Sequence, residues 1–246
     1  YKGKLTVNGN LVQLSGGVYT AETDGDLEIA VNFTAKVKMK ITVDGAETEI
    51  TEGETFVLPE NGETGFIGYE IDGKLYFAKD EIVVNSDTTA VSVKLDIEFL
   101  GASMRLTEPA GLRFEYSADK QGFDKLSSLA TVEIGVVLLP TDLVGDGEEL
   151  TLDTENAART GKISFSDTET EKKFNAVLTE IPESGYEREF TARAFVTVTV
   201  NGKTTTVYYE LAIRSVKSVA EIALSNLGET LEEEQVALLK KFAGVE

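Results

Sequence analysis

The sequence contains no cysteine, histidine or tryptophan in 246 residues. The missing cysteine excludes a scaffold stapled by disulfides. The missing histidine removes the side chain that most often transfers protons near pH 7. Without cysteine and histidine, the sequence also lacks the most common side chains for nucleophilic catalysis and for transition-metal binding. No apolar run approaches the ~20 residues that a membrane-spanning helix requires. We therefore expect a protein that is not an enzyme.

Basic residues are also scarce, because 43 aspartates and glutamates outnumber 23 lysines and arginines and give a net charge of −20. The excess is spread along the chain, with 18 acidic and 8 basic side chains in residues 1–99 and 25 and 15 in residues 100–246. Such a surface repels phosphate backbones and anionic lipid headgroups. We expect no nucleic acid partner, no membrane insertion of this segment and a monomer with solvated acidic faces.

What the sequence does contain is a series of short segments rich in Val, Ile, Thr and Tyr, separated by Gly, Asn and Asp. Asn-Gly and Asp-Gly dipeptides are typical of tight type I′ hairpin turns, and we expect turns at Asn8-Gly9, Asp24-Gly25, Asp44-Gly45, Asp72-Gly73 and Asn201-Gly202. Period-two alternation predicts a strand over residues 27–33 whose four apolar side chains share one buried face. The pattern predicts an all-β protein.

Helices are expected at only two places, over residues 123–130 and in a C-terminal helical hairpin over 216–243. Ser215 is positioned to cap the first helix of the hairpin. Thr230 and Glu233 have the spacing of a capping box at the start of the second helix. We expect the hairpin to pack on the sheets and cover an edge.

The stretch from Ile41 to Val93 is ITVDGAETEITEGETFVLPE…TGFIGYEIDGKLYFAKDEIVVNSDTTAVSV. It resembles the small β-grasp-like repeats of secreted Gram-positive surface proteins. In those repeats an apolar strand leads through a Gly turn and Leu-Pro to a Gly-aromatic strand. Gly68-Tyr69 occupies the place where the repeats usually have Gly-Trp, which changes core volume more than fold. Residues 4–33 look like a shorter relative.

Three segments beyond residue 100 appear in a fixed order: GASMRLTEPAGLRFEY, FDKLSSLATVEIGVVLLPTDLV and EREFTARAFVTVTVNGKTTTVYYELAIRSVKSVA. Over residues 100–224 they resemble a module of unknown function from secreted, multi-domain surface proteins of Gram-positive anaerobes. The resemblance implies an extracellular or cell-wall location and supplies no active site.

These patterns predict tandem small β modules. They are a short β repeat over residues 1–35, a β-grasp-like repeat over 36–99, and an immunoglobulin-like β-sandwich with C-terminal helices over 100–246. The chain opens at Tyr1 without an initiator methionine, so we expect it to be excised from a longer protein.

All six arginines lie beyond position 104, and four of them interrupt apolar stretches of predicted strands: Arg105, Arg113, Arg193 and Arg214. Arginine holds a carboxylate at fixed geometry better than lysine does. We expect these four to be structural and to pair with carboxylates or carbonyls on neighbouring strands, because an unpaired buried guanidinium is costly. The alternative is a shallow site for an anionic group such as a uronic acid or teichoic acid.

The polar segment 141–161 is predicted to be a loop, and it contains the acidic residues Asp142, Asp146, Glu148 and Asp153. Calcium takes about six to eight oxygen ligands from such flexible, carboxylate-rich loops. The spacing is not that of an EF-hand loop, so a solvated loop is the first expectation and a calcium site the alternative. No other cofactor is expected.

Tyr69 and Tyr76 lie on adjacent predicted strands, as do Tyr208 and Tyr209. Aromatic faces stack on sugar rings, which makes these residues candidates for glycan binding. Alternation along a strand points one residue of each adjacent pair into the core, so core packing is the competing interpretation.

Taken with the resemblances, the missing catalytic side chains favour a non-catalytic module of a secreted or cell-wall-attached bacterial surface protein. It would act as a spacer or an adhesion segment, with a glycan or a cell-surface protein as partner. The alternative is a carbohydrate-binding accessory module of a secreted glycan-degrading enzyme.

Overall fold

The computed structural model describes residues 2–12, 28–145, 147–160, 163, 165–227 and 229–245. Strands make up 51% of the protein and helices 18%, which confirms the all-β prediction with its C-terminal helical pair. Residue contacts group the chain into two compact units, one of residues 1–57 and 81–90 and the other of 58–80 and 91–246. The predicted module boundaries after residues 35 and 99 stay a prediction.

A three-stranded antiparallel sheet of order β2-β1-β3 opens the first unit. Its strands are β1 (Lys2–Val7), β2 (Asn10–Leu11) and β3 (Ile29–Thr34). The prediction of a buried apolar face was wrong for Ile29 and Val31, which are 59% and 48% exposed, because no described segment covers that face of the sheet. The sequence also predicts a strand over residues 18–22, and these residues lie outside the described ranges.

The rest of the first unit contains the strands β4 (Lys38–Val43), β5 (Ala46–Thr51), β6 (Glu54–Val57), β9 (Glu81–Val84) and the start of β10 (Thr88–Lys94). β4 pairs antiparallel with β5 through the predicted Asp44-Gly45 turn and parallel with the first residues of β10, while β6 pairs with β9. Ile41, Ile50 and Val84 form a small buried core in this unit.

The second unit begins with β7 (Phe66–Ile71), β8 (Lys74–Tyr76) and the end of β10. The chain then forms β11 (Ile97–Arg105), β12 (Gly111–Asp119), α1 (Lys120–Leu129), β13 (Thr131–Pro140), the 3₁₀ turn η1 (Thr141–Leu143), β14 (Ala158–Arg159) and β15 (Ser166–Asp167). It ends with β16 (Glu171–Thr179), the 3₁₀ turn η2 (Glu183–Gly185), β17 (Glu189–Val200), β18 (Lys203–Ser215), α2 (Val216–Leu227) and α3 (Glu233–Ala243). β7 pairs with β8 and with the end of β10. The strands from β11 to β18 form two antiparallel sheets of orders β11-β12-β16-β15 and β14-β13-β17-β18.

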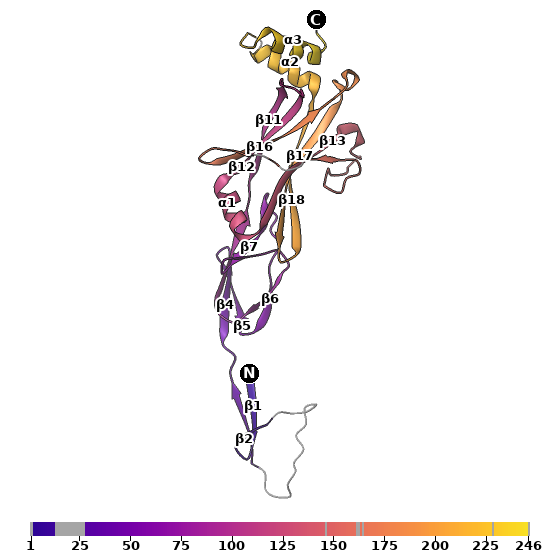
Figure 1. Ribbon diagram of the computed structural model, residues 1–246. Helices are drawn as coiled ribbons and strands as arrows, with labels where there is room; N and C mark the ends of the chain where they lie inside the picture. The colour runs from indigo at the N-terminus through magenta and orange to yellow at the C-terminus, as the bar shows by residue number, and fades with distance from the viewer. Residues whose placement is uncertain are drawn as a thin grey trace. The chain divides into compact units, whose positions relative to one another are not determined.

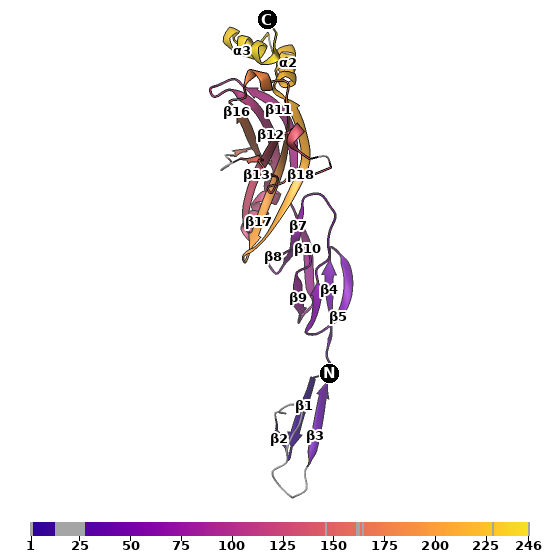
Figure 2. The same ribbon diagram turned by 90° about the vertical axis from the view of Figure 1, so that its right-hand side faces the viewer.

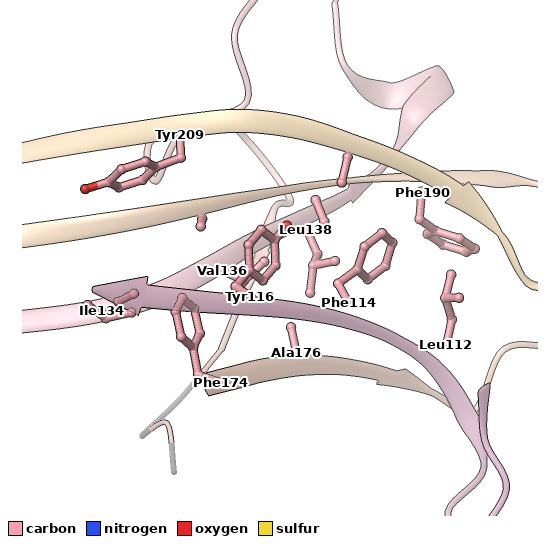
Figure 3. Close-up of a cluster of buried hydrophobic side chains, with 14 of the residues drawn as sticks. Leu112, Phe114, Tyr116, Ile134, Val136, Leu138, Phe174, Ala176, Phe190 and Tyr209 are labelled. Carbon is pink, nitrogen blue, oxygen red and sulfur yellow. The ribbon is translucent and has the colours of Figure 1, made fainter. Parts of the chain in front are cut away.

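These two sheets face each other across the main core, as Figure 3 shows for side chains of β12, β13 and β16. Alternation places Leu112, Phe114 and Tyr116 of β12 inward, and none of the three is exposed. Burying each such side chain contributes about 1.5–3 kcal/mol to folding. Figures 1 and 2 both place β7 at one end of this unit and the pair α2–α3 at the other.

Aromatic rings form a continuous row through this core. Phe99 lies 5.2 Å from Tyr116, and Tyr116 stacks on Phe174 at 5.6 Å and 17°. Phe174 meets Phe165 edge-on at 6.1 Å, and Phe165 lies 5.4 Å from Phe123. Centroid separations of this size are favourable for aromatic pairs. The row therefore fixes the position of the last two rings at the side of the sandwich.

Two buried tyrosines of this core differ in how their hydroxyls are used. The Tyr209 hydroxyl donates a 2.6 Å hydrogen bond to the Leu95 carbonyl. The Tyr116 hydroxyl has no hydrogen-bond partner within the described structure. We expect Tyr116→Phe to raise the free energy of unfolding by about 1 kcal/mol and Tyr209→Phe to lower it by about 1–3 kcal/mol. Urea denaturation of both variants tests this, and a change of the same sign in both would contradict it.

Burial raises the pKa of both hydroxyls, and the nearby Asp96 carboxylate adds to the rise at Tyr209. A pKa that is raised in the folded state means that the folded protein binds the proton more tightly than the unfolded chain. Stability from these groups is complete below the unfolded pKa of about 10 and is lost as the pH rises above it. We expect the unfolding free energy to fall above about pH 10 by up to ~1.4 kcal/mol per pH unit for each tyrosine. Urea denaturation at increasing pH should show that the unfolding free energy falls less steeply with pH in the double variant Tyr116→Phe, Tyr209→Phe than in the parent.

The predicted helix at 123–130 is confirmed, but α1 begins earlier, at Lys120. Its start is set by Asp119, whose carboxylate accepts a hydrogen bond from the Gly122 amide at 2.5 Å. The prediction that Ser215 caps α2 was correct, because its hydroxyl accepts a hydrogen bond from the Ser218 amide at 3.2 Å.

The capping box predicted for the last helix was wrong by two residues. In α3 the box is formed by Glu232 and Gln235. Thr230 instead donates from its hydroxyl to the Leu227 carbonyl at 2.8 Å, so it closes the turn after α2. Glu233 is the first residue of α3, where its charge favours the positive end of the helix.

Candidate functional site

The segment that follows β13 packs on the outer face of the sheet β14-β13-β17-β18. We call residues 141–145 and 147–157 the covering segment. Its Leu150 is fully buried against Val137 and Leu139 of β13 and Phe195 of β17. The prediction of a solvated loop holds for exposed residues such as Glu148, Glu149 and Asp153 but was wrong for Leu150. The reason is that β13 carries apolar side chains on both faces, and the outer ones require cover.

Arg193 of β17 holds the covering segment to the sheet. Its Nε donates to the Tyr209 carbonyl at 2.7 Å, and Nη1 donates to the Glu149 carboxylate at 2.9 Å and to the Leu150 carbonyl at 3.3 Å. The guanidinium lies 5.1 Å above the Tyr208 ring, a cation–π contact. The Tyr208 hydroxyl in turn accepts from the Leu152 amide at 3.0 Å. With only 13% of its side chain exposed, Arg193 has a structural position.

A second arginine holds the beginning of the covering segment. Arg188 donates from Nε and Nη2 to the two carboxylate oxygens of Asp142, at 2.7 and 2.9 Å. This bidentate contact holds the pKa of the Asp142 carboxyl below its usual range. No local sequence pattern points to Arg188, because its partner lies 46 positions away along the chain.

The four residues of the predicted calcium site are placed as follows. Asp142 is engaged by Arg188, Glu148 and Asp153 are exposed, and Asp146 lies outside the described residues. Within the described ranges no three Asp or Glu side chains come together in a way that would hold a metal ion. The calcium site stays a prediction that includes one undescribed ligand.

The four arginines of the predicted strands divide between the two sheets and form no common site. Arg105 and Arg113 lie on β11 and β12, whereas Arg193 and Arg214 lie on β17 and β18. Arg105 donates to the Glu108 carbonyl at 3.3 Å, and Arg214 donates to the Ile213 carbonyl at 2.7 Å.

Arg113 has the weakest contact of the four. Its Nη1 lies 3.7 Å from the Glu115 carboxylate, and its Nε is buried without a hydrogen-bond partner in the described structure. Each of the four arginines thus contacts a carboxylate or a carbonyl.

Tyr69 and Tyr76 face each other across the register of β7 and β8. Tyr69 is only 1% exposed and packs edge-on against Phe66 at 5.1 Å, so its ring has no free face for a sugar. Gly68 precedes it because a Cβ there would lie 2.2 Å from the Tyr76 carbonyl oxygen. Tyr76 is half-buried.

A hollow of about 500 Å³ lies at the side of the sandwich where the edge strands β14 and β15 are only two residues long. We call it the edge hollow. Its lining includes Phe123 of α1, Glu133 and Ile134 of β13, Arg159 of β14, Thr160 and Phe165. The sequence analysis missed this site, because its residues come from three separate parts of the chain and show no common spacing.

Comparison with known proteins gives no name to these features. No family model matches the chain, and neither a curated protein nor a solved structure matches it. In the described ranges no helix is long and apolar enough to cross a bilayer. Any function has to be argued from the geometry.

Proposed function

We propose that this chain is a non-catalytic module of a secreted or cell-wall-attached bacterial surface protein and acts as a spacer or adhesion segment. The observation that carries the proposal is the strand order of the second unit. We letter β11, β12 and β13 as A, B and C, β14 as C′, and β15 to β18 as D to G. The order is then A-B-E-D in one sheet and C′-C-F-G in the other. That is the order of immunoglobulin-like sandwiches, which recur in cell-surface domains.

The first unit supports the β-grasp-like assignment of residues 36–99. Its strands β4 and β10 pair in parallel although they are far apart in the sequence, and β4 also forms a hairpin with β5. A parallel pair between the first and last strands of a small module requires the chain to cross between them. This arrangement is compatible with a compact repeat.

Because a fold alone does not fix a function, the use of the charged side chains also matters. Arg193 and Arg188 are occupied in holding the covering segment, and they take Glu149 and Asp142 as partners. These features support a structural role for the module.

Two measurements test the proposal. An antibody raised against the purified protein should label intact cells that express it. Labelling that requires permeabilised cells would refute the surface location. Purified protein should release no product from plant, mucin or cell-wall glycans. Hydrolysis that is lost on substitution of a single Asp or Glu would refute the non-catalytic role.

A further inference from the structure

The edge hollow is an apolar corner that stays open to solvent. Phe123 and Phe165 form the corner, and Phe165 is 37% exposed although it is a large apolar side chain. A hollow of about 500 Å³ falls within the range of small-ligand sites, roughly 300–1,000 Å³. Exposed apolar surface next to converging polar groups is the usual form of such a site.

The two rings are held in place before any ligand arrives. Phe165 contacts the buried Phe174 edge-on, and the Lys172 ammonium lies 5.1 Å from the centres of both Phe123 and Phe165. Lys172 is itself fixed, because it pairs with Asp167 directly across the β15–β16 ladder at 2.7 Å and has only 11% of its side chain exposed. A corner fixed in this way loses little conformational freedom on binding.

The rim of the hollow carries both donors and an acceptor. Arg159 is exposed and has no acidic partner among the described residues, in a chain with 43 acidic side chains. Glu133 supplies an exposed carboxylate. Thr160 accepts from the Val136 amide at 2.9 Å through its hydroxyl oxygen, which leaves the hydroxyl hydrogen for donation.

We propose that the edge hollow binds one neutral pyranose residue of a glycan. The C–H face of the ring packs on Phe123 and Phe165, and neighbouring hydroxyls accept from Arg159 and donate to Glu133. A hydroxyl pair satisfies both charged groups at once. Arg159 and Glu133 carry opposite charges and Lys172 is neutralised by Asp167, so the hollow has no net charge that would favour an anionic or a cationic sugar. The inference rests on the proposed function, since it assigns a ligand class to the adhesion role.

Isothermal titration of the whole chain with cello-, manno-, galacto- and chito-oligosaccharides tests the inference. We expect at least one neutral series to bind, and both Arg159→Ala and Phe165→Ala to weaken it by about tenfold or more. Arg214→Ala is the matched control, because it removes an exposed arginine away from the hollow and should leave binding unchanged. Arg159 is exposed, so its variant should keep the parental melting temperature even if Phe165→Ala does not.

Three results would overturn the inference: no neutral series binds, an oligouronate binds more tightly than every neutral series, or binding survives in the Arg159 variant. None of these affects the surface role, which depends on labelling of intact cells. Labelling only after permeabilisation would refute the surface role even if a neutral sugar binds in the hollow.

Discussion

Leu150→Ala should lower the free energy of unfolding by about 2–5 kcal/mol. Leu150 is fully buried between the covering segment and the outer face of β13 and β17, so truncation removes apolar contacts and leaves a cavity beside Val137, Leu139 and Phe195. Denaturant unfolding monitored by circular dichroism measures the change.

The matched control is Leu143→Ala in the same segment. Leu143 is 55% exposed, so its truncation should change stability by no more than about 0.5 kcal/mol. Equal effects of the two substitutions would show that the segment is a loop without a packed face.

Arg193→Ala should lower the free energy of unfolding by about 2–4 kcal/mol. The substitution leaves the carbonyls of Tyr209 and Leu150 without their donor in a half-buried place. The partner Glu149 is 73% exposed, so the ion pair itself contributes little to this loss. Thermal and urea denaturation measure the effect, and the binding of neutral oligosaccharides should not change.

Arg214→Ala is the control on the neighbouring strand. Arg214 is exposed, donates to the carbonyl of Ile213 beside it and lies 5.4 Å above the Phe99 ring, so its removal should cost no more than about 1 kcal/mol. If Arg193→Ala is as stable as the parent and abolishes binding of a uronic acid, the anionic-ligand alternative replaces the structural interpretation.

Local chemistry made much of the fold predictable. The predicted turns at Asn8, Asp44, Asp72 and Asn201 are present, and these residues have φ between 46° and 50°. The predicted turn at Asp24-Gly25 lies outside the described residues. Such turns depend on two adjacent residues, so no distant contact is needed to recognise them. Period-two alternation is visible along β12, where Leu112, Phe114 and Tyr116 face the main core.

The sequence was a poorer guide where distant segments decide the outcome. Alternation correctly indicated a strand at Ile29–Val31, but burial depends on what covers it. The polar composition of 141–161 concealed Leu150, whose partners lie on β13 and β17. One signal was present, since Val136–Leu139 is apolar at every position and indicates a strand buried on both faces.

The candidate site was less predictable than the fold. Arg193 was singled out, but its partners on the covering segment were not, because they lie 43 and 44 positions away in the sequence. Tyr69 was a candidate for sugar stacking and is buried in the core. The edge hollow has no sequence motif, since it exists only where two short edge strands leave the sandwich open.

A double-mutant cycle between Arg193→Ala and Leu150→Ala tests most directly whether the strand-embedded arginine serves to hold the covering segment. Both substitutions release the same segment from the same sheet face, so the second should cost much less once the first is made. We expect the double variant to be more stable than the sum of the single losses predicts, by at least about 1 kcal/mol. Losses that add within about 0.5 kcal/mol would contradict the structural role of Arg193.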